Sequence, residues 1–170
     1  MLAALAYEYP VDRLVVALKY QQQQALAPLL GELLAIRVLT TNVEIPECAQ
    51  VVPVPLHPGR YRERGFNQAE LIAAAVCQKL VSECIGESGL TLKRDCLQRA
   101  RPTAAQKGLG RRRRLMNPEG AFCGSSSVAG REVILVDDVI TTGATVAACR
   151  QALLDAGACG VSVWAVARSL

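Results

Sequence analysis

With 170 residues, the chain is long enough to bury one sizeable core and too short for two ordinary domains. Hydrophobic residues make up 51% and aromatic residues only 4%, so the core must consist mainly of Ala, Leu and Val, a composition that suits an α/β protein. The net charge is +4, and no apolar run approaches the roughly 20 residues that cross a bilayer, so we expect a cytoplasmic protein without membrane insertion.

Positive charge is concentrated in two segments. Residues 93–114 carry a net charge of +8 and residues 57–64 carry +2, which leaves −6 for the rest of the chain. Basic segments of this kind favour a polyanionic partner, either pyrophosphate or nucleic acid or both.

The cysteines predict no cross-linking. They are seven in number, at positions 48, 77, 84, 96, 123, 149 and 159, and no two form a Cys-x-x-Cys pair, so neither a disulfide framework nor a zinc ribbon is indicated. Cys77, Cys84 and Cys149 lie in helical patterns rich in Ala and Leu, where we expect small buried hydrophobic side chains. The single histidine, His57, argues against a metal cluster.

Two helices are predicted at the N-terminal end. Apolar residues at 11, 14, 15 and 18 predict the first helix, over residues 11–20, and the second covers residues 25–39. Lys19 lies near the end of the first helix. Attraction to the helix dipole explains a cation at this position, and ligand binding explains it equally well. We expect a single domain over residues 1–170, with an N-terminal helical or hood region at 1–45 and a core at 46–170.

A strand and a helix follow. Residues 50–55 predict a short strand that runs into a loop, which Pro53, Pro55 and Pro58 should keep non-helical. Asn67 is predicted to open a helix, with Glu70 three residues later as a variant of the capping box. This helix should continue through Val81.

The remaining pattern alternates between strands and helices. Residues 91–97 predict a strand, and residues 99–118 form a basic stretch with Gly and Pro that is typical of a functional lid or a disordered segment. Residues 144–156 predict a helix, and residues 161–166 a last strand. The order of these elements indicates a mainly parallel central sheet flanked by helices, with right-handed crossovers.

Residues 133–145 are the most informative segment. A buried parallel strand at 133–136 is followed by two carboxylates, Asp137 and Asp138, and then by a loop that leads into a helix. The loop offers backbone N–H groups, small hydroxyls and a helix N-terminus, which suit a phosphate dianion. Its residues are Thr141, Thr142, Gly143, Ala144 and Thr145. Since the carboxylates can accept hydrogen bonds from a cis-diol, the segment predicts a site for ribose 5-phosphate.

This segment closely resembles the fingerprint of the type I phosphoribosyltransferases, which bind phosphoribosyl pyrophosphate (PRPP). The resemblance implies that Asp137 and Asp138 hold the ribose hydroxyls, as the residues that serve catalysis, and that residues 141–145 hold the 5′-phosphate. The alternative is a strand–turn–helix in which the Thr and Asp side chains only cap the helix. Capping needs one such residue, whereas this segment supplies five.

A second group of functional candidates lies at residues 53–69. The loop after the earlier strand carries Arg60, Arg62 and Arg64, whose guanidinium groups suit phosphate oxygens. Parallel strands aim their C-terminal ends at one edge of the sheet, so this loop should meet residues 133–145 across a crevice. Exposed, solvated side chains remain an alternative for some of these arginines, and Asn67 suits a helix cap better than a ligand contact.

The two segments, together with residues 101–109 and 117–122, resemble the ComF/GntX family of competence-associated phosphoribosyltransferase-like proteins over nearly the whole chain. The resemblance implies the type I phosphoribosyltransferase fold with a small N-terminal hood and a flexible basic loop. It places Arg60, Arg62, Arg64 and Asn67 near the pyrophosphate and assigns Arg101, Thr103, Gln106 and Arg114 to the flexible loop. Members commonly begin with a four-cysteine zinc ribbon, which this sequence does not contain.

Three functions remain open at this stage. The first is transfer of phosphoribosyl from PRPP to a nitrogen acceptor with release of pyrophosphate, in which Mg²⁺ is held by substrate oxygens and waters. The second is a non-catalytic protein that senses PRPP or a nucleotide, or docks partners such as a helicase in DNA uptake or DNA utilisation. The third is direct binding of single-stranded DNA by the basic segments, with Tyr61 and Phe66 as the main candidates for base stacking.

Overall fold

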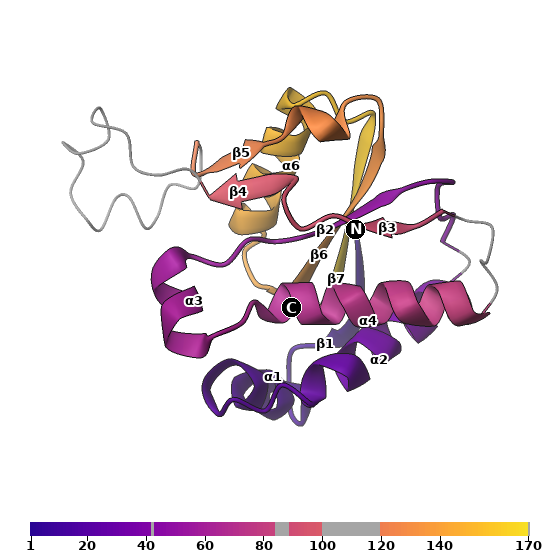
Figure 1. The fold of residues 1–170 in the computed structure, drawn as a ribbon. Coiled ribbons are helices and arrows are strands. Elements are labelled where there is room, and N and C mark those ends of the chain that lie inside the picture. Colours follow the sequence, from indigo (N-terminus) through magenta and orange to yellow (C-terminus); the bar gives the residue numbers. More distant parts are fainter. Residues whose placement is uncertain (42, 84–88, 100–119, 170) are drawn as a thin grey trace.

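The computed structural model describes residues 1–41, 43–83, 89–99 and 120–169, and in these ranges a five-stranded sheet forms the centre of the molecule (Figure 1). The strand order is β1-β7-β6-β2-β3, and every neighbouring pair is parallel. The strands are β1 (Leu2–Ala6), β2 (Gln50–Pro53), β3 (Thr91–Leu92), β6 (Glu132–Ile140) and β7 (Gly160–Arg168). The parallel α/β architecture predicted from the alternating pattern is therefore confirmed.

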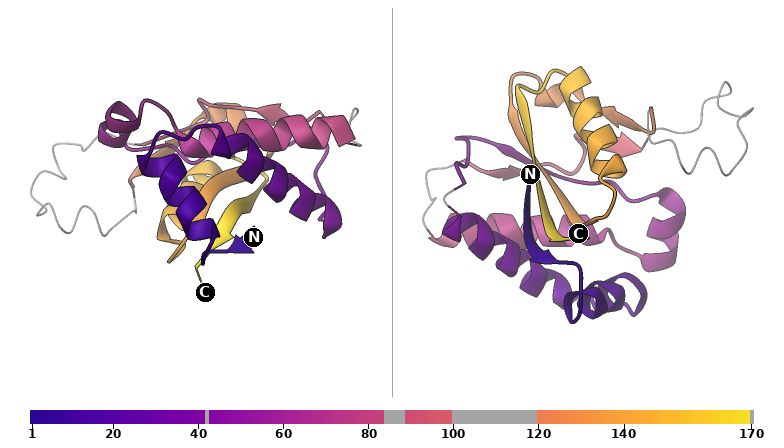
Figure 2. Two further views of the ribbon diagram at one scale, coloured as in Figure 1. Left: turned by 90° about the horizontal axis from the view of Figure 1, so that it is seen from below. Right: turned by 180° about the vertical axis from the view of Figure 1, so that it is seen from behind.

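Helices cover both faces of the sheet (Figures 1 and 2). One face carries α1 (Val11–Tyr20), α2 (Leu26–Thr40) and α4 (Gln68–Glu83); the other carries α6 (Ala144–Asp155). Beside α6 lies a two-stranded antiparallel ribbon of β4 (Leu97–Arg99) and β5 (Phe122–Gly124), followed by the short helix η2 (Ser126–Val128). Among the described residues, no helix has the length and apolar character needed to cross a membrane.

Two hydrophobic clusters hold the layers together. Along β6, Ile134 and Val136 pack into the cluster beneath α2 and α4, whereas Val133 and Leu135 pack into the cluster beneath α6. Successive strand residues point to opposite faces, so a strand covered on both sides must be apolar at every position. Trp164, which is 2% exposed, belongs to the α2–α4 cluster and is a core residue.

The chain reverses direction across the sheet between β2 and β6. From β2 it passes through α4 to β3 at one edge, and from β6 it passes through α6 to β7 on the other side. In open parallel sheets, ligands bind outside the C-terminal ends of the strands at such a switch point. The segments that follow β2 and β6 are therefore the first place to look for a site.

Three elements differ from the sequence predictions. The strand β1 was not predicted, because its residues are Leu and Ala without a β-branched side chain; pairing with β7, in the register Leu2↔Trp164, holds it as an edge strand. The predicted strand at 91–97 is divided, since β3 ends at Leu92 and the chain then leaves the main sheet to form β4.

The third difference is the helix α3 (Pro58–Arg64), which lies where a non-helical loop was predicted. Pro58 occupies the first helical position, where its missing N–H costs nothing, and His57 Nδ1 accepts a hydrogen bond from Gly59 N at 3.1 Å as a helix cap. Pro53 and Pro55 precede the helix, as expected. The prediction was wrong because it treated Pro58 as a breaker when it initiates the helix.

Candidate functional site

The two carboxylates lie within β6, at the switch point. Pairing between β2 and β6 ends at Pro53↔Val136, whereas β7 continues alongside β6 as far as Ile140↔Arg168. Asp137 and Asp138 therefore lie just beyond the last residue pair between β6 and β2, where β7 still pairs with β6 on the other side. The strand was predicted to end at residue 136, before the carboxylates; in the structure it extends through them to Ile140.

The carboxylates are turned toward different surroundings, as neighbours on a strand must be. Asp137 lies on the α6 side and lines a small hollow of about 50 Å³. Asp138 lies on the side of α1, where Lys19 meets it. Each takes one backbone hydrogen bond at its Oδ1 atom: Asp137 from the N–H of Asp138 at 2.8 Å, and Asp138 from the N–H of Val139 at 2.7 Å.

The hollow gathers the residues that the sequence assigned to a phosphate. It is lined by Asp137, Val139, Ile140, Thr141, Thr142, Gly143, Ala144, Thr145 and Val146. Gly143 is the residue before α6 and has a φ of 78°, a left-handed conformation that favours glycine. A glycine there lets the loop turn tightly into the helix.

Gly143, the residue before α6, provides no side-chain cap. The only side-chain hydrogen bond to this end of α6 among the described residues is a long one, in which Ala144 N donates to Thr142 Oγ1 at 3.4 Å. Capping accounts for only part of this segment, because Asp137 and Asp138 accept from N–H groups of β6 and not from α6. The first N–H groups of α6 point toward the loop, and the helix dipole favours an anion at this end.

Asp137 is electrostatically unusual. Burial raises its pKa well above the ordinary value of 3.8, and the negative charge of Asp138 raises it further, although the backbone N–H of Asp138 and the cation of Lys19 act against this. Burial also raises the pKa of the Cys149 thiol, which feels Asp137 from α6. Asp137 can thus hold a proton at a pH where most carboxyl groups are ionised, and can donate as well as accept a hydrogen bond.

Asp138 forms an ion pair with Lys19 at the end of α1. Lys19 Nζ lies 2.9 Å from Asp138 Oδ2, and the two side chains are 20% and 4% exposed. The ammonium does not approach along a hydrogen-bonding direction, so Oδ2 is a buried acceptor without a hydrogen bond among the described residues. Lys19 was not predicted as a site residue, because its place at the end of an amphipathic helix explained its charge equally well.

The arginines of α3 differ in their surroundings. Arg60 and Arg62 are exposed, whereas Arg64 is partly buried and held on two sides. Its Nη1 donates to Gln68 Oε1 at 2.9 Å, and its guanidinium lies 5.0 Å from the ring centre of Tyr20 in α1. Arg64 therefore joins α3 to the start of α4 and to the residue next to Lys19.

Asn67 is a structural residue in this arrangement. Its Oδ1 accepts from Ala69 N at 3.1 Å, which caps α4, and its Nδ2 donates to the carbonyl of Val54 at 3.1 Å. Both ends of the amide are thus used inside the protein, as the cap interpretation expects. Glu70 serves elsewhere, since its Oε1 accepts from Arg94 Nε at 2.6 Å.

The other expected site residues have mixed outcomes. Arg101, Thr103, Gln106 and Arg114 lie outside the described residues. Phe66 is only 7% exposed, so it cannot offer a ring face for base stacking, whereas Tyr61 is 50% exposed. Within the described ranges, no three His, Cys, Asp or Glu side chains gather into a group that could hold a metal ion.

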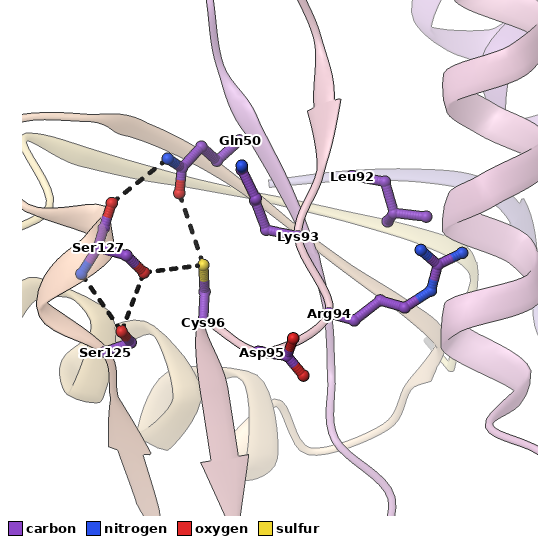
Figure 3. A pocket seen from close by; sticks show the side chains of 8 residues that line it. All are labelled: Gln50, Leu92, Lys93, Arg94, Asp95, Cys96, Ser125 and Ser127. Atoms are coloured by element: carbon purple, nitrogen blue, oxygen red, sulfur yellow. Dashed lines mark hydrogen bonds between the residues drawn. The ribbon is translucent and has the colours of Figure 1, made fainter.

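A second cavity of about 390 Å³ lies away from the carboxylates, between the edge of the sheet at Gln50 and the ends of the β4–β5 ribbon (Figure 3). Its polar side chains bond to one another: Gln50 Nε2 donates to the Ser127 carbonyl, and the thiol of Cys96 lies against Gln50 Oε1 and Ser127 Oγ. Arg94 turns away toward α4, where it meets Glu70. This network links the ribbon to the sheet.

Similar proteins are known by sequence, although no protein-family model matches the chain. The DNA utilization protein YhgH of Escherichia coli K12 is 37% identical over 168 residues, which cover 96% of this chain and 70% of the relative. Competence protein F of Haemophilus influenzae is 31% identical over 170 residues, with the same shares covered. Competence protein ComFC of Streptococcus pneumoniae is 33% identical over 120 residues, covering 70% of this chain and 48% of the relative.

Solved structures resemble the fold. The glutamine phosphoribosylpyrophosphate (PRPP) amidotransferase from B. subtilis, in complex with ADP and GMP, matches with a TM-score of 0.52 at 20% identity. The match covers 82% of this chain and 26% of the amidotransferase chain. At this identity the likeness concerns the fold alone, and the fold is that of the type I phosphoribosyltransferases.

Proposed function

The chain belongs to the ComF family of competence and DNA-utilisation proteins, and on that premise we propose that it binds PRPP at the C-terminal end of β6. One observation carries the proposal: Asp137 and the loop residues 141–145 line a single hollow at the N-terminus of α6, where the N-cap residue is a glycine, beside the switch point of a parallel sheet. This arrangement supplies acceptors for a ribose diol next to donors for a phosphate.

Each part of the site has a role in this proposal. The loop and the first N–H groups of α6 bind the 5′-phosphate, and Asp137 and Asp138 hold the ribose hydroxyls. The arginines that follow β2 supply positive charge for the pyrophosphate, with Arg64 held in place and Arg60 and Arg62 exposed. Asn67 supports this side through the cap of α4 rather than by touching the ligand.

Mg²⁺ fits the donor set of the site as a partner of the substrate. Guanidinium groups cannot ligate a cation, and among the described residues no three His, Cys, Asp or Glu side chains form a metal-binding group, so phosphate oxygens and waters would be its main ligands. When bound, Mg²⁺ would neutralise charge on the departing pyrophosphate.

We also propose that bound PRPP is used for transfer of phosphoribosyl to a nitrogen acceptor in the cytoplasm. The site contains groups that bind and orient, and a displacement at C1 needs no protein nucleophile, because the acceptor attacks and pyrophosphate leaves. The basic residues 93–114 are the segment proposed to meet DNA or a partner protein in the family's role in DNA utilisation.

Calorimetric titration tests the binding proposal. We expect Mg²⁺ and PRPP together to bind more tightly than ribose 5-phosphate, which lacks the pyrophosphate, and ribose 5-phosphate to bind more tightly than inorganic phosphate, which lacks the diol. Equal affinity for PRPP and inorganic phosphate would mean that only a phosphate is recognised and would contradict the proposal.

Pyrophosphate release tests the transfer proposal. A screen of purine, pyrimidine and amine acceptors with PRPP should yield pyrophosphate with at least one of them. Tight PRPP binding together with silence across the screen would instead support a protein that senses PRPP.

A further inference from the structure

Lys19 reaches the site from a distant part of the chain. It lies in the last turn of α1, and its ammonium is 2.9 Å from a carboxylate oxygen of Asp138, more than a hundred residues later. The lysine side chain is 20% exposed and the aspartate side chain 4%, so the pair is largely removed from water. Charges in such surroundings interact far more strongly than charges at the surface.

A second lysine pair shows the contrast. Lys79 and Glu83 lie one turn apart on α4, 2.6 Å from each other, with side chains that are 30% and 46% exposed. Pairs of this kind on one helix contribute little, because water screens them and both side chains keep their freedom. The pair of Lys19 and Asp138 differs because it joins two elements and one partner is buried.

Lys19 and the backbone together fix the Asp138 carboxylate. Its Oδ1 accepts from Val139 N at 2.7 Å, and its Oδ2 faces the ammonium without a hydrogen bond. Without Lys19, this buried carboxylate would keep a second acidic group beside it, Asp137, whose ionisation the charge of Asp138 disfavours. A buried charge that loses its partner tends to reorient or to take up a proton.

The end of α1 is itself held in place. Tyr20, the residue after Lys19, lies under the guanidinium of Arg64 at 5.0 Å, and Arg64 donates to Gln68 at the start of α4. These contacts tie the last turn of α1 to α3 and α4, which follow β2. The position of the ammonium thus depends on the same segment that carries the arginines of the proposed pyrophosphate side.

We propose that Lys19 is a positioning residue of the PRPP site, which acts by holding the Asp138 carboxylate in the orientation that accepts the ribose diol. This inference rests on the proposed function. It assigns to α1 a part in ligand binding. It also explains why the last turn of α1, which faces the two carboxylates, carries a lysine.

Binding of two ligands tests the inference. The substitution Lys19→Met removes the charge and keeps the length of the side chain, and it should weaken PRPP and ribose 5-phosphate by the same factor, about 10-fold, because both ligands carry the diol. Lys19→Arg should restore most of the affinity. Lys79→Met, which breaks the exposed pair, is the matched control and should leave binding unchanged.

A double-mutant cycle separates action through Asp138 from a direct contact. If Lys19 works through Asp138, adding Lys19→Met to Asp138→Asn should cause little further loss beyond Asp138→Asn alone. Additive losses, or a loss confined to PRPP, would mean that Lys19 touches the pyrophosphate itself and would overturn the inference. Lys19→Gln, which keeps a polar side chain without charge, serves if Lys19→Met does not fold.

The outcome for the parent protein keeps the two proposals apart. A parent that binds neither PRPP nor ribose 5-phosphate refutes the proposed function, and the inference falls with it. A parent that binds both ligands, with unchanged affinities in folded Lys19→Met, refutes the inference alone.

Discussion

At the scale of single residues, Asp137 connects ligand binding to stability. Its carboxyl is buried and lies beside a second carboxylate, so its ionisation is disfavoured in the folded protein. Folding therefore favours the protonated form, and the folded state binds more protons than the unfolded state between pH 3.8 and the raised pKa. The contribution of Asp137 to stability therefore falls as the pH rises through this window. A carboxylate in such a place is retained for a role other than stability.

We therefore predict that Asp137→Asn makes the ligand-free protein more stable at neutral pH, by roughly 1 kcal/mol or more, because an amide has no charge to bury. The variant should also lose the part of the pH dependence that belongs to this window. Denaturant unfolding at several pH values measures both effects. Asp95→Asn, at an exposed position, is the control and should change neither. Lower stability of Asp137→Asn at neutral pH would show that the carboxylate is favourably paired instead.

Asn67 gives a second prediction at this scale. Its amide caps α4 and binds the Val54 carbonyl, and the residue is only 9% exposed, so Asn67→Ala should destabilise the fold by about 1–2 kcal/mol. Urea unfolding measures the loss. Asn67→Ser keeps an oxygen that can cap α4 and removes the second contact without burying a charge, so it should cost less. A loss of PRPP affinity with unchanged stability in Asn67→Ala would favour the ligand contact implied by the family resemblance.

At the scale of elements, α2 and α4 cross at a very short distance. Gly31 lies at this crossing, where an added Cβ would stand 2.6 Å from Ala75 Cβ and 2.8 Å from the Ile72 carbonyl oxygen. Two helix backbones can approach this closely only where one residue lacks a side chain.

Gly31→Ala should accordingly destabilise the protein by about 1–3 kcal/mol, since the helices must separate. The substitution is a sharp test, because in an exposed helix Ala is favoured over Gly by about 1 kcal/mol. Thermal or urea unfolding measures the change. Glu32→Ala, at the exposed neighbouring position of α2, should have little effect. An increase in stability for Gly31→Ala would contradict the close packing of α2 and α4.

The elements differ in how far their sequences could predict them. Most elements were predicted, because the spacing of their hydrophobic residues matches the faces that they bury. These elements are β6, β7, α1, α2, α4 and α6. The strand β1 is composed of Leu and Ala and owes its conformation to its partner β7, a contact that its own residues do not encode. In α3 no residue is buried, so no periodic pattern was available and Pro58 was misread.

At the scale of the whole molecule, the site follows from topology. A parallel sheet that reverses between β2 and β6 brings the segments after these two strands to one edge, and this could be predicted from the order of elements alone. The approach of Lys19 could not, because it depends on how α1 packs over the sheet. The opposite orientations of Asp137 and Asp138 were missed for another reason: the predicted strand ended too early at residue 136.

The most direct test of the account is the thermal stability of the protein with Mg²⁺ and PRPP. Ligand at about 100 times its dissociation constant adds about 2.7 kcal/mol to the stability of the folded state. For a chain of this size we expect the melting temperature of the parent to rise by roughly 5–10 °C. The double variant Asp137→Asn with Asp138→Asn should show no rise. A parent that does not respond to PRPP, or a double variant that responds equally, would contradict the assignment of these carboxylates to a PRPP site.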